Sequence, residues 1–135
     1  METMNVNDLE NMDIVEPEKK KIDVMKYVGI ESVIVDAKVS EESINQYGKP
    51  SKYIEFSSAE IGKLDNGNPL YARKRCFLNK DPKGKWGFGE KSPLAQMFEQ
   101  AKTRNYKELI GKKIKIIPRQ DTHDAKIFYI DFTLV

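Results

Sequence analysis

The chain has little of what disulfide-linked, metal-binding and membrane-spanning proteins require. Its 135 residues include one cysteine and one histidine, too few for an intrachain disulfide or for the usual Cys/His metal clusters. No apolar run approaches the ~20 residues of a membrane-spanning helix, and no basic start with a following apolar stretch marks a secretory signal. We therefore expect a cytoplasmic protein of the cell interior, without membrane contact, bound metal or cofactor.

Charge is unevenly distributed along the chain. Residues 1–20 hold six acidic residues and two lysines, a net charge of −4, whereas the remaining residues hold 21 basic and 15 acidic groups, a net charge of +6. The first segment has no aromatic residue and no sustained periodicity, so residues 1–21 are expected to form a flexible acidic tail. Residues 22–135 are expected to form a single domain. The tail is predicted to compete with an anionic ligand or to dock a protein partner.

Alternation and turn signals predict five strands in the body of the chain. They are expected over residues 27–39, within 52–58, from residue 70 onward, within 108–118 and over 126–135. Residues 86–89 are predicted to fold back as a short arm. The residues expected to face the core on the first strand are Val33, Val35, Ala37 and Val39. Those on the last strand are Phe128, Ile130, Phe132 and Leu134.

One helix is predicted, within "SPLAQMFEQAKTRN". Ser92 is a suitable N-cap, and Pro93 suits the first helical position, where a missing N–H costs nothing. The following apolar residues recur with the helical period and form a stripe for a core. They are Leu94, Met97, Phe98 and Ala101.

The order of three strands, a helix and two strands resembles the oligonucleotide/oligosaccharide-binding (OB) fold. "LIGKKIKII", where a Gly-Lys turn enters the fourth strand, adds to the resemblance over residues 22–135. It implies a mainly β protein built on a five-stranded OB-like barrel, with the helix between strands 3 and 4. A ferredoxin-like fold would need a second helix, and a plain β-sandwich would leave the capped helix unexplained.

The third predicted strand, "LYARKRCFL", carries rings and guanidinium groups on alternate residues. Strand side chains alternate between faces, so one set points to solvent and the other to the interior. The solvent-facing set is Tyr71, Arg73, Arg75 and Phe77, with Tyr53 of the preceding strand beside it. The interior set is Ala72, Lys74, Cys76 and Leu78, in which Lys74 does not fit and is assigned to a bend.

Exposed rings among basic groups are what single-stranded nucleic acid requires. Rings stack on unpaired bases for about 1–3 kcal/mol each, and Arg or Lys neutralises phosphates. A duplex binder instead needs an element that enters a groove. In OB-fold proteins the ligand lies on strands 2 and 3 and the adjoining loops, which the resemblance maps onto the same face.

Two further segments add candidate contacts. In "KGKWGFG", Lys85 and Trp86 form a mobile arm for the ligand, or else Trp86 closes the end of the barrel, and Phe88 is expected in the core under the helix. The loop between Arg119 and Lys126 has a histidine between two aspartates; we interpret it as a solvated turn that also offers a phosphate contact. The glycines match neither Rossmann nor P-loop spacing.

The sequence predicts a non-enzymatic protein that binds single-stranded DNA, or RNA with lower preference, with little sequence specificity. One alternative is a protein-interaction module in a replication, repair or viral assembly, because such interfaces also favour rings and arginine. A small nuclease is a weaker alternative, since no acidic cluster suited to Mg²⁺ is visible. The candidate contacts are Tyr53, Tyr71, Arg73, Arg75, Phe77, Lys85, Trp86 and Arg119.

Overall fold

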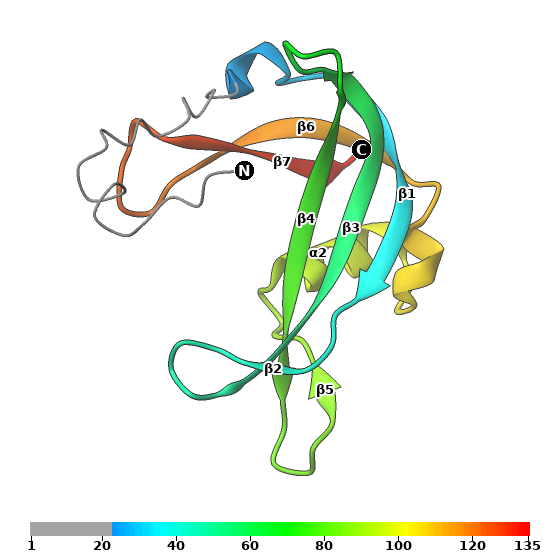
Figure 1. Cartoon of the computed structure of the whole chain (residues 1–135). Helices are drawn as coiled ribbons and strands as arrows, with labels where there is room; N and C mark the ends of the chain where they lie inside the picture. The colour runs from blue at the N-terminus through cyan, green and yellow to red at the C-terminus, as the bar shows by residue number, and fades with distance from the viewer. Residues whose placement is uncertain (1–22) are drawn as a thin grey trace, which may run out of the picture.

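The computed structural model describes residues 23–135, so the predicted acidic tail, residues 1–21, lies outside the described residues (Figure 1). This part is mainly β with one α-helix, as predicted, and has no helix long and apolar enough to cross a membrane. The strands are β1 (Glu31–Val39), β2 (Ser43–Ile44), β3 (Pro50–Lys63), β4 (Pro69–Lys80), β5 (Trp86–Gly87), β6 (Lys113–Gln120) and β7 (Phe128–Leu134). The helices are α2 (Pro93–Ala101) and the 3₁₀ turns η1 (Val24–Lys26) and η2 (Tyr106–Leu109).

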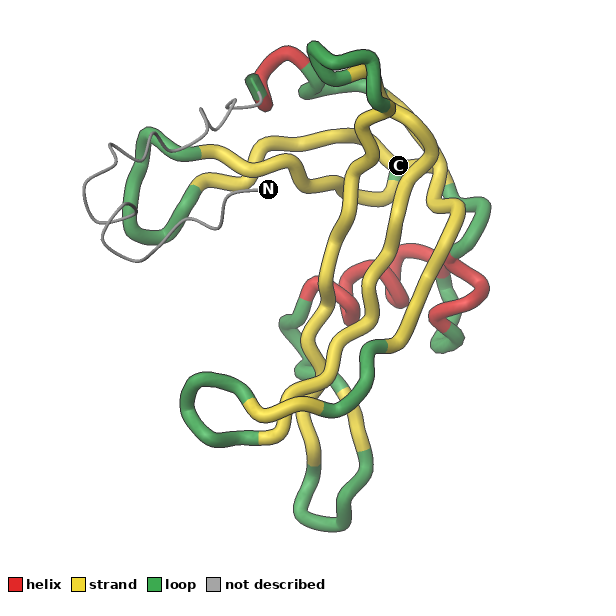
Figure 2. The backbone as a smooth tube through the Cα atoms, in the orientation of Figure 1, coloured by secondary structure: helices red, strands yellow, loops and turns green. Residues whose placement is uncertain are grey.

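The strands form one antiparallel sheet of order β5-β4-β3-β1-β6-β7, with β2 added to β3 (Figure 2). This corrects the predicted five-stranded OB-like barrel: the sheet has seven strands and is open. β4 and β7 are in contact, but within residues 23–135 no backbone ladder joins them. The side chain of Lys74 bridges them instead, because its Nζ donates to the Phe132 carbonyl at 2.9 Å and lies 3.0 Å from Asp131 Oδ1. This bridge explains why a lysine lies on the inner face of β4.

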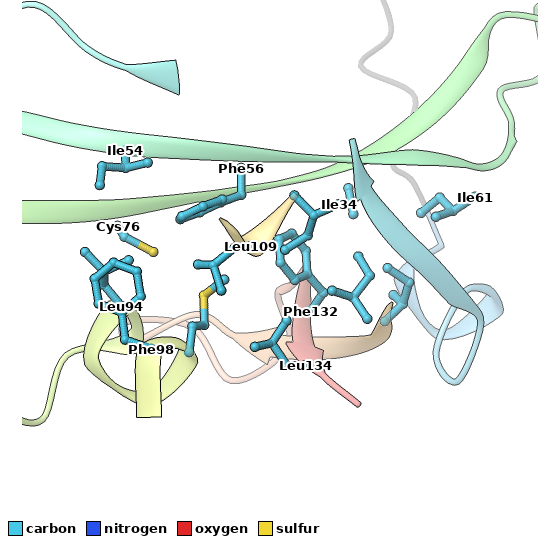
Figure 3. Close-up of a cluster of buried hydrophobic side chains, with 14 of the residues drawn as sticks. Ile34, Ile54, Phe56, Ile61, Cys76, Leu94, Phe98, Leu109, Phe132 and Leu134 are labelled. Atoms are coloured by element: carbon cyan, nitrogen blue, oxygen red, sulfur yellow. The ribbon is translucent and has the colours of Figure 1, made fainter. Parts of the chain in front are cut away.

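The core lies between the inner face of β3 and β4 on one side and α2 and β7 on the other (Figure 3). Ser92 Oγ accepts a hydrogen bond from the Ala95 N–H at 3.2 Å, which confirms the predicted cap. The buried residues contributed by α2 belong to the predicted stripe and are Leu94, Met97 and Phe98. Those contributed by the strands include Ile54, Phe56, Cys76, Ile114, Ile116, Phe132 and Leu134.

The predicted inner face of β1 is wrong over part of the strand. Ile34 is 1% exposed and Val35 is 51% exposed, the reverse of the expectation. The pairing of β1 with β3 shifts register between Ile34 and Asp36, and such a bulge changes which residues face the core. On β7, Phe128 is exposed rather than buried, because it lies at the start of the strand, where the hairpin extends beyond the core.

A buried serine holds the end of β4 that carries Tyr71 and Arg73. Ser58 Oγ donates to the Ala59 carbonyl at 2.7 Å and accepts from the Ala72 N–H at 2.9 Å. The β3–β4 register shifts just after Ser57, so the hydroxyl satisfies a backbone donor that the ladder leaves there. Tyr71 and Arg73 flank Ala72 and are positioned by this contact.

A glycine on β3 lets η1 pack against the same end of the sheet. A Cβ at Gly62 would lie 2.7 Å from Tyr27 Cε1, which is closer than two carbons approach without a clash. Tyr27 follows η1 directly. The missing side chain at Gly62 therefore brings η1 close to the β3–β4 turn (Figure 1).

Candidate nucleic-acid interface

The alternation predicted along β4 is confirmed. Tyr71 is 43% and Phe77 60% exposed, and Arg73 and Arg75 between them are exposed as well. The intervening residues are buried or half-buried. We call the four solvent-facing residues Tyr71, Arg73, Arg75 and Phe77 the β4 row. They lie on the outer face of the sheet because their neighbours on either side point into the core.

The second half of the β4 row forms a cluster with β3. The rings of Tyr53 and Phe77 meet edge to face, with centroids 5.5 Å apart, and the Arg75 guanidinium lies 4.6 Å from the Tyr53 ring centroid. Arg75 Nε also donates to Glu55 Oε1 at 3.1 Å. Arg75 is therefore already engaged by both a ring and a carboxylate, and its charge is largely compensated.

The first half of the β4 row opens into a groove of about 770 Å³, here called the β4–β7 groove. It lies between the facing edges of β4 and β7, and η1 forms part of its wall. Lys74 joins these two edges further along β4, so the groove is the part of the sheet opening that the lysine does not seal. Its walls include Met25, Tyr71, Arg73, Lys126, Phe128 and Tyr129.

Among residues 23–135, the cations around the β4–β7 groove differ from Arg75 in forming no salt bridge. The Arg119 guanidinium stacks 4.9 Å from the ring centroid of Tyr129, so the β6–β7 hairpin places this predicted residue beside Tyr129 of the groove wall. In the described part of the chain, the salt bridges involve Lys38, Lys74, Arg75 and Lys80 but none of Arg73, Arg119 and Lys126. Within the β4 row, the charge that remains available to an anionic ligand is therefore that of Arg73, which lies in the groove wall with Lys126.

Tyr129 is the main site residue that the sequence reasoning missed. Because its neighbour Ile130 is predicted to face the core, alternation along the last strand places Tyr129 outside. Its contact with Arg119 follows from the β6–β7 pairing, in which these two residues are direct cross-strand partners. Alternation along the strand therefore indicates that the Tyr129 ring is exposed, but it does not indicate that Arg119 lies against that ring.

The structure places Lys85 and Trp86 away from the β4 row. Trp86 pairs with Lys80 across the β4–β5 ladder. Lys80 comes four residues after the buried Cys76 and therefore lies on the same face of β4. Cross-strand partners share a face, so Trp86 lies on the inner side of the sheet. Its ring contacts the ammonium groups of Lys52 and Lys80, at 5.8 and 5.6 Å from the centroid. Trp86 is half-buried and lies outside the core cluster. Lys85 is exposed in the adjoining turn.

Two other predictions concern the core side. Phe88 is 41% exposed rather than buried, although its ring does meet Phe98 of α2 edge to face at 5.2 Å. Cys76 is buried, as predicted. Burial raises the pKa of its thiol to about 11, against an opposing effect of the Lys74 ammonium. The thiol is therefore protonated at neutral pH and has little nucleophilic character.

The loop with the single histidine is a turn capped by its first aspartate. Asp121 Oδ2 accepts from the N–H groups of His123 and Asp124 at 3.3 and 3.0 Å. Residues 23–135 contain no group of three or more His, Cys, Asp or Glu side chains placed to hold a metal ion. In comparisons with known proteins, no family model, no curated protein and no solved structure matched the chain.

Proposed function

We propose that this protein binds single-stranded nucleic acid without enzymatic activity, DNA in preference to RNA and with little sequence specificity. The observation that carries the proposal is one continuous surface of rings and cations. It starts at Tyr53 and Phe77, follows the β4 row to Tyr71, and ends in the β4–β7 groove beside Tyr129 and Arg119.

The dimensions of this surface suit an extended strand. Tyr71 and Phe77 are six residues apart on a strand, or about 20 Å, and OB-type surfaces accommodate about 4–16 nucleotides each. Exposed rings offer stacking to any base, and cations offer neutralisation to any phosphate. Neither contact reads base edges, so we propose low sequence specificity.

The strand pairing supports the resemblance to the OB fold. β1 pairs with both β3 and β6, β4 pairs with the other edge of β3, and β7 pairs with the other edge of β6. In the chain, α2 lies between β5 and β6. We propose that the sheet is an open, OB-like arrangement in which the Lys74 side chain, and no backbone ladder within residues 23–135, joins β4 to β7. In that fold the outer face of the strands corresponding to β3 and β4 binds the ligand.

Individual residues take different roles in this proposal. Tyr53, Tyr71 and Phe77 stack on bases, and Tyr129 adds a ring at the groove. Arg73, Arg119 and Lys126 contact phosphates, whereas Arg75 mainly orients the Tyr53 ring. Lys85 and Trp86 contact the ligand only if the strand passes around the edge of the sheet at β5.

Fluorescence anisotropy of labelled oligo-dT and oligo-U tests the proposal, with a dT·dA duplex as the control. We expect binding to dT that weakens between about 50 and 200 mM salt, less binding to U, and the weakest binding to duplex. Absence of binding at low salt would refute the proposal and leave the protein-interaction module as the alternative. The emission of Trp86, the only tryptophan, reports separately whether the strand reaches β5.

A further inference from the structure

We infer that the acidic N-terminal segment of this chain occupies the β4–β7 groove and competes there with nucleic acid. The competition rests on the proposed function, whereas the occupancy does not. The segment of 22 residues that precedes Asp23 is the occupant to which three observations point: its attachment site, its charge and the open strand edges.

The segment is attached at the groove itself. Asp23, Val24 and Met25 are part of the groove wall, so the preceding residue enters at its rim. A short tether of this kind gives an effective concentration in the millimolar range, and 22 residues extend up to about 70 Å. A weak intrinsic affinity is therefore sufficient for substantial occupancy.

The charges of segment and groove are complementary. Residues 1–22 hold six acidic residues and three lysines, a net charge of −3. The groove wall holds Arg73 and Lys126 against Asp23, and Arg119 lies beside it on Tyr129. None of these three cations takes part in a salt bridge among the described residues. By contrast, Arg75 and Lys80 at the other end of β4 already pair with Glu55 and Glu42. The acidic segment is thus directed to the groove and not to the rest of the β4 row.

The groove also offers main-chain and apolar contacts to an extended segment. Before Asn79, β4 pairs only with β3, and β7 pairs only with β6 in residues 23–135, so the edges that face the groove carry backbone groups outside any ladder. Exposed edges of this kind accept an added strand. Leu9, Ile14 and Val15 of the segment provide apolar side chains for Phe128 and Tyr129 of the wall.

Paramagnetic relaxation in the full-length chain tests occupancy without any nucleic acid. A nitroxide is attached through Asn7→Cys; Cys76 is 2% exposed and unreactive, and the wild-type chain treated identically is the control. We expect signal loss at the amides of Arg73 and Tyr129 in low salt, little loss at Tyr47 or Lys83 in the distal loops, and recovery at about 1 M salt, where the Debye length is about 3 Å. Equal loss at all four positions, or none, would overturn the inference.

A charge-neutralised segment tests the competition. The full chain with Glu10→Gln, Asp13→Asn and Glu16→Gln is titrated with labelled dT at low salt. A segment that binds at about 1 mM with an effective concentration of a few millimolar weakens dT binding threefold to fivefold, so the variant is expected to bind that much more tightly.

The matched control removes the same amount of negative charge from the body of the protein. Glu41, Glu90 and Glu99 are exposed and form no salt bridge in the described structure, and their replacement by Gln changes only the general field. Equal tightening in the two variants would overturn the competition. If neither variant nor the wild type binds dT, the proposed function fails while the relaxation data still decide whether the segment occupies the groove.

Discussion

The two arginines in the middle of the β4 row should differ in their contribution to salt-dependent binding. Arg73 has no acidic partner in the described part of the chain, whereas Arg75 Nε lies 3.1 Å from Glu55 Oε1. Both are exposed on the same strand, two residues apart. Arg73→Gln and Arg75→Gln are therefore a matched pair that remove the same charge from neighbouring positions with different local compensation.

The expected magnitude follows from counterion release. On a single strand each neutralised phosphate adds about 0.7 to the slope of log K against log salt concentration, so a fourfold rise in salt weakens binding about 2.6-fold per contact. Arg73→Gln should lower the slope by about 0.7. Arg75→Gln should change it by less than half of that, because Glu55 already neutralises the guanidinium.

The assay is anisotropy of labelled oligo-dT at four or five salt concentrations between about 50 and 200 mM. Glu55→Gln completes the set: it releases Arg75, and we expect both a steeper slope and tighter binding at low salt. Equal slopes for Arg73→Gln and Arg75→Gln, or a Glu55→Gln variant that binds as the wild type does, would refute the proposed difference between the two halves of the β4 row.

Three further predictions concern stability, each measured by urea unfolding. Ser58→Ala should lower the free energy of unfolding by about 1–3 kcal/mol, because the N–H of Ala72 loses its buried acceptor; a loss below 0.5 kcal/mol would contradict that role. Lys74→Met should cost about 2 kcal/mol, since it leaves the mostly buried Asp131 carboxylate without its cation, and an unchanged midpoint would argue against the bridge. The raised pKa of Cys76, about 11, keeps the folded thiol protonated while the unfolded thiol ionises from about pH 9, so stability is unaffected below pH 9 and falls by about 2–3 kcal/mol toward pH 11. Cys76→Ala should lose that part of the pH dependence, and an identical profile in both proteins would contradict it.

The faces of β4 and the position of the helix were predictable because they depend on local rules. Two-residue alternation sends Arg73 outward whatever strand lies next to it. Ser92 and Pro93 start the helix through contacts within one turn. The same local rules failed on β1, where a bulge between Ile34 and Asp36 reverses the phase, and a bulge depends on the register with a partner strand.

Local patterns in the sequence predicted five strands, the short arm at β5 and a solvent-facing row of rings and arginines, but they missed β2 and the full length of β3. Only the tertiary structure decided that the sheet stays open at β4 and β7, that Glu55 compensates Arg75, that Trp86 lies on the opposite side from the row, and that Tyr129 and Arg119 lie at a groove with Arg73. The two groups of features differ in the sequence separation of the residues on which they depend. Side-chain alternation and turn chemistry involve residues a few positions apart, whereas charge compensation and groove formation depend on which strand edges approach one another across the fold.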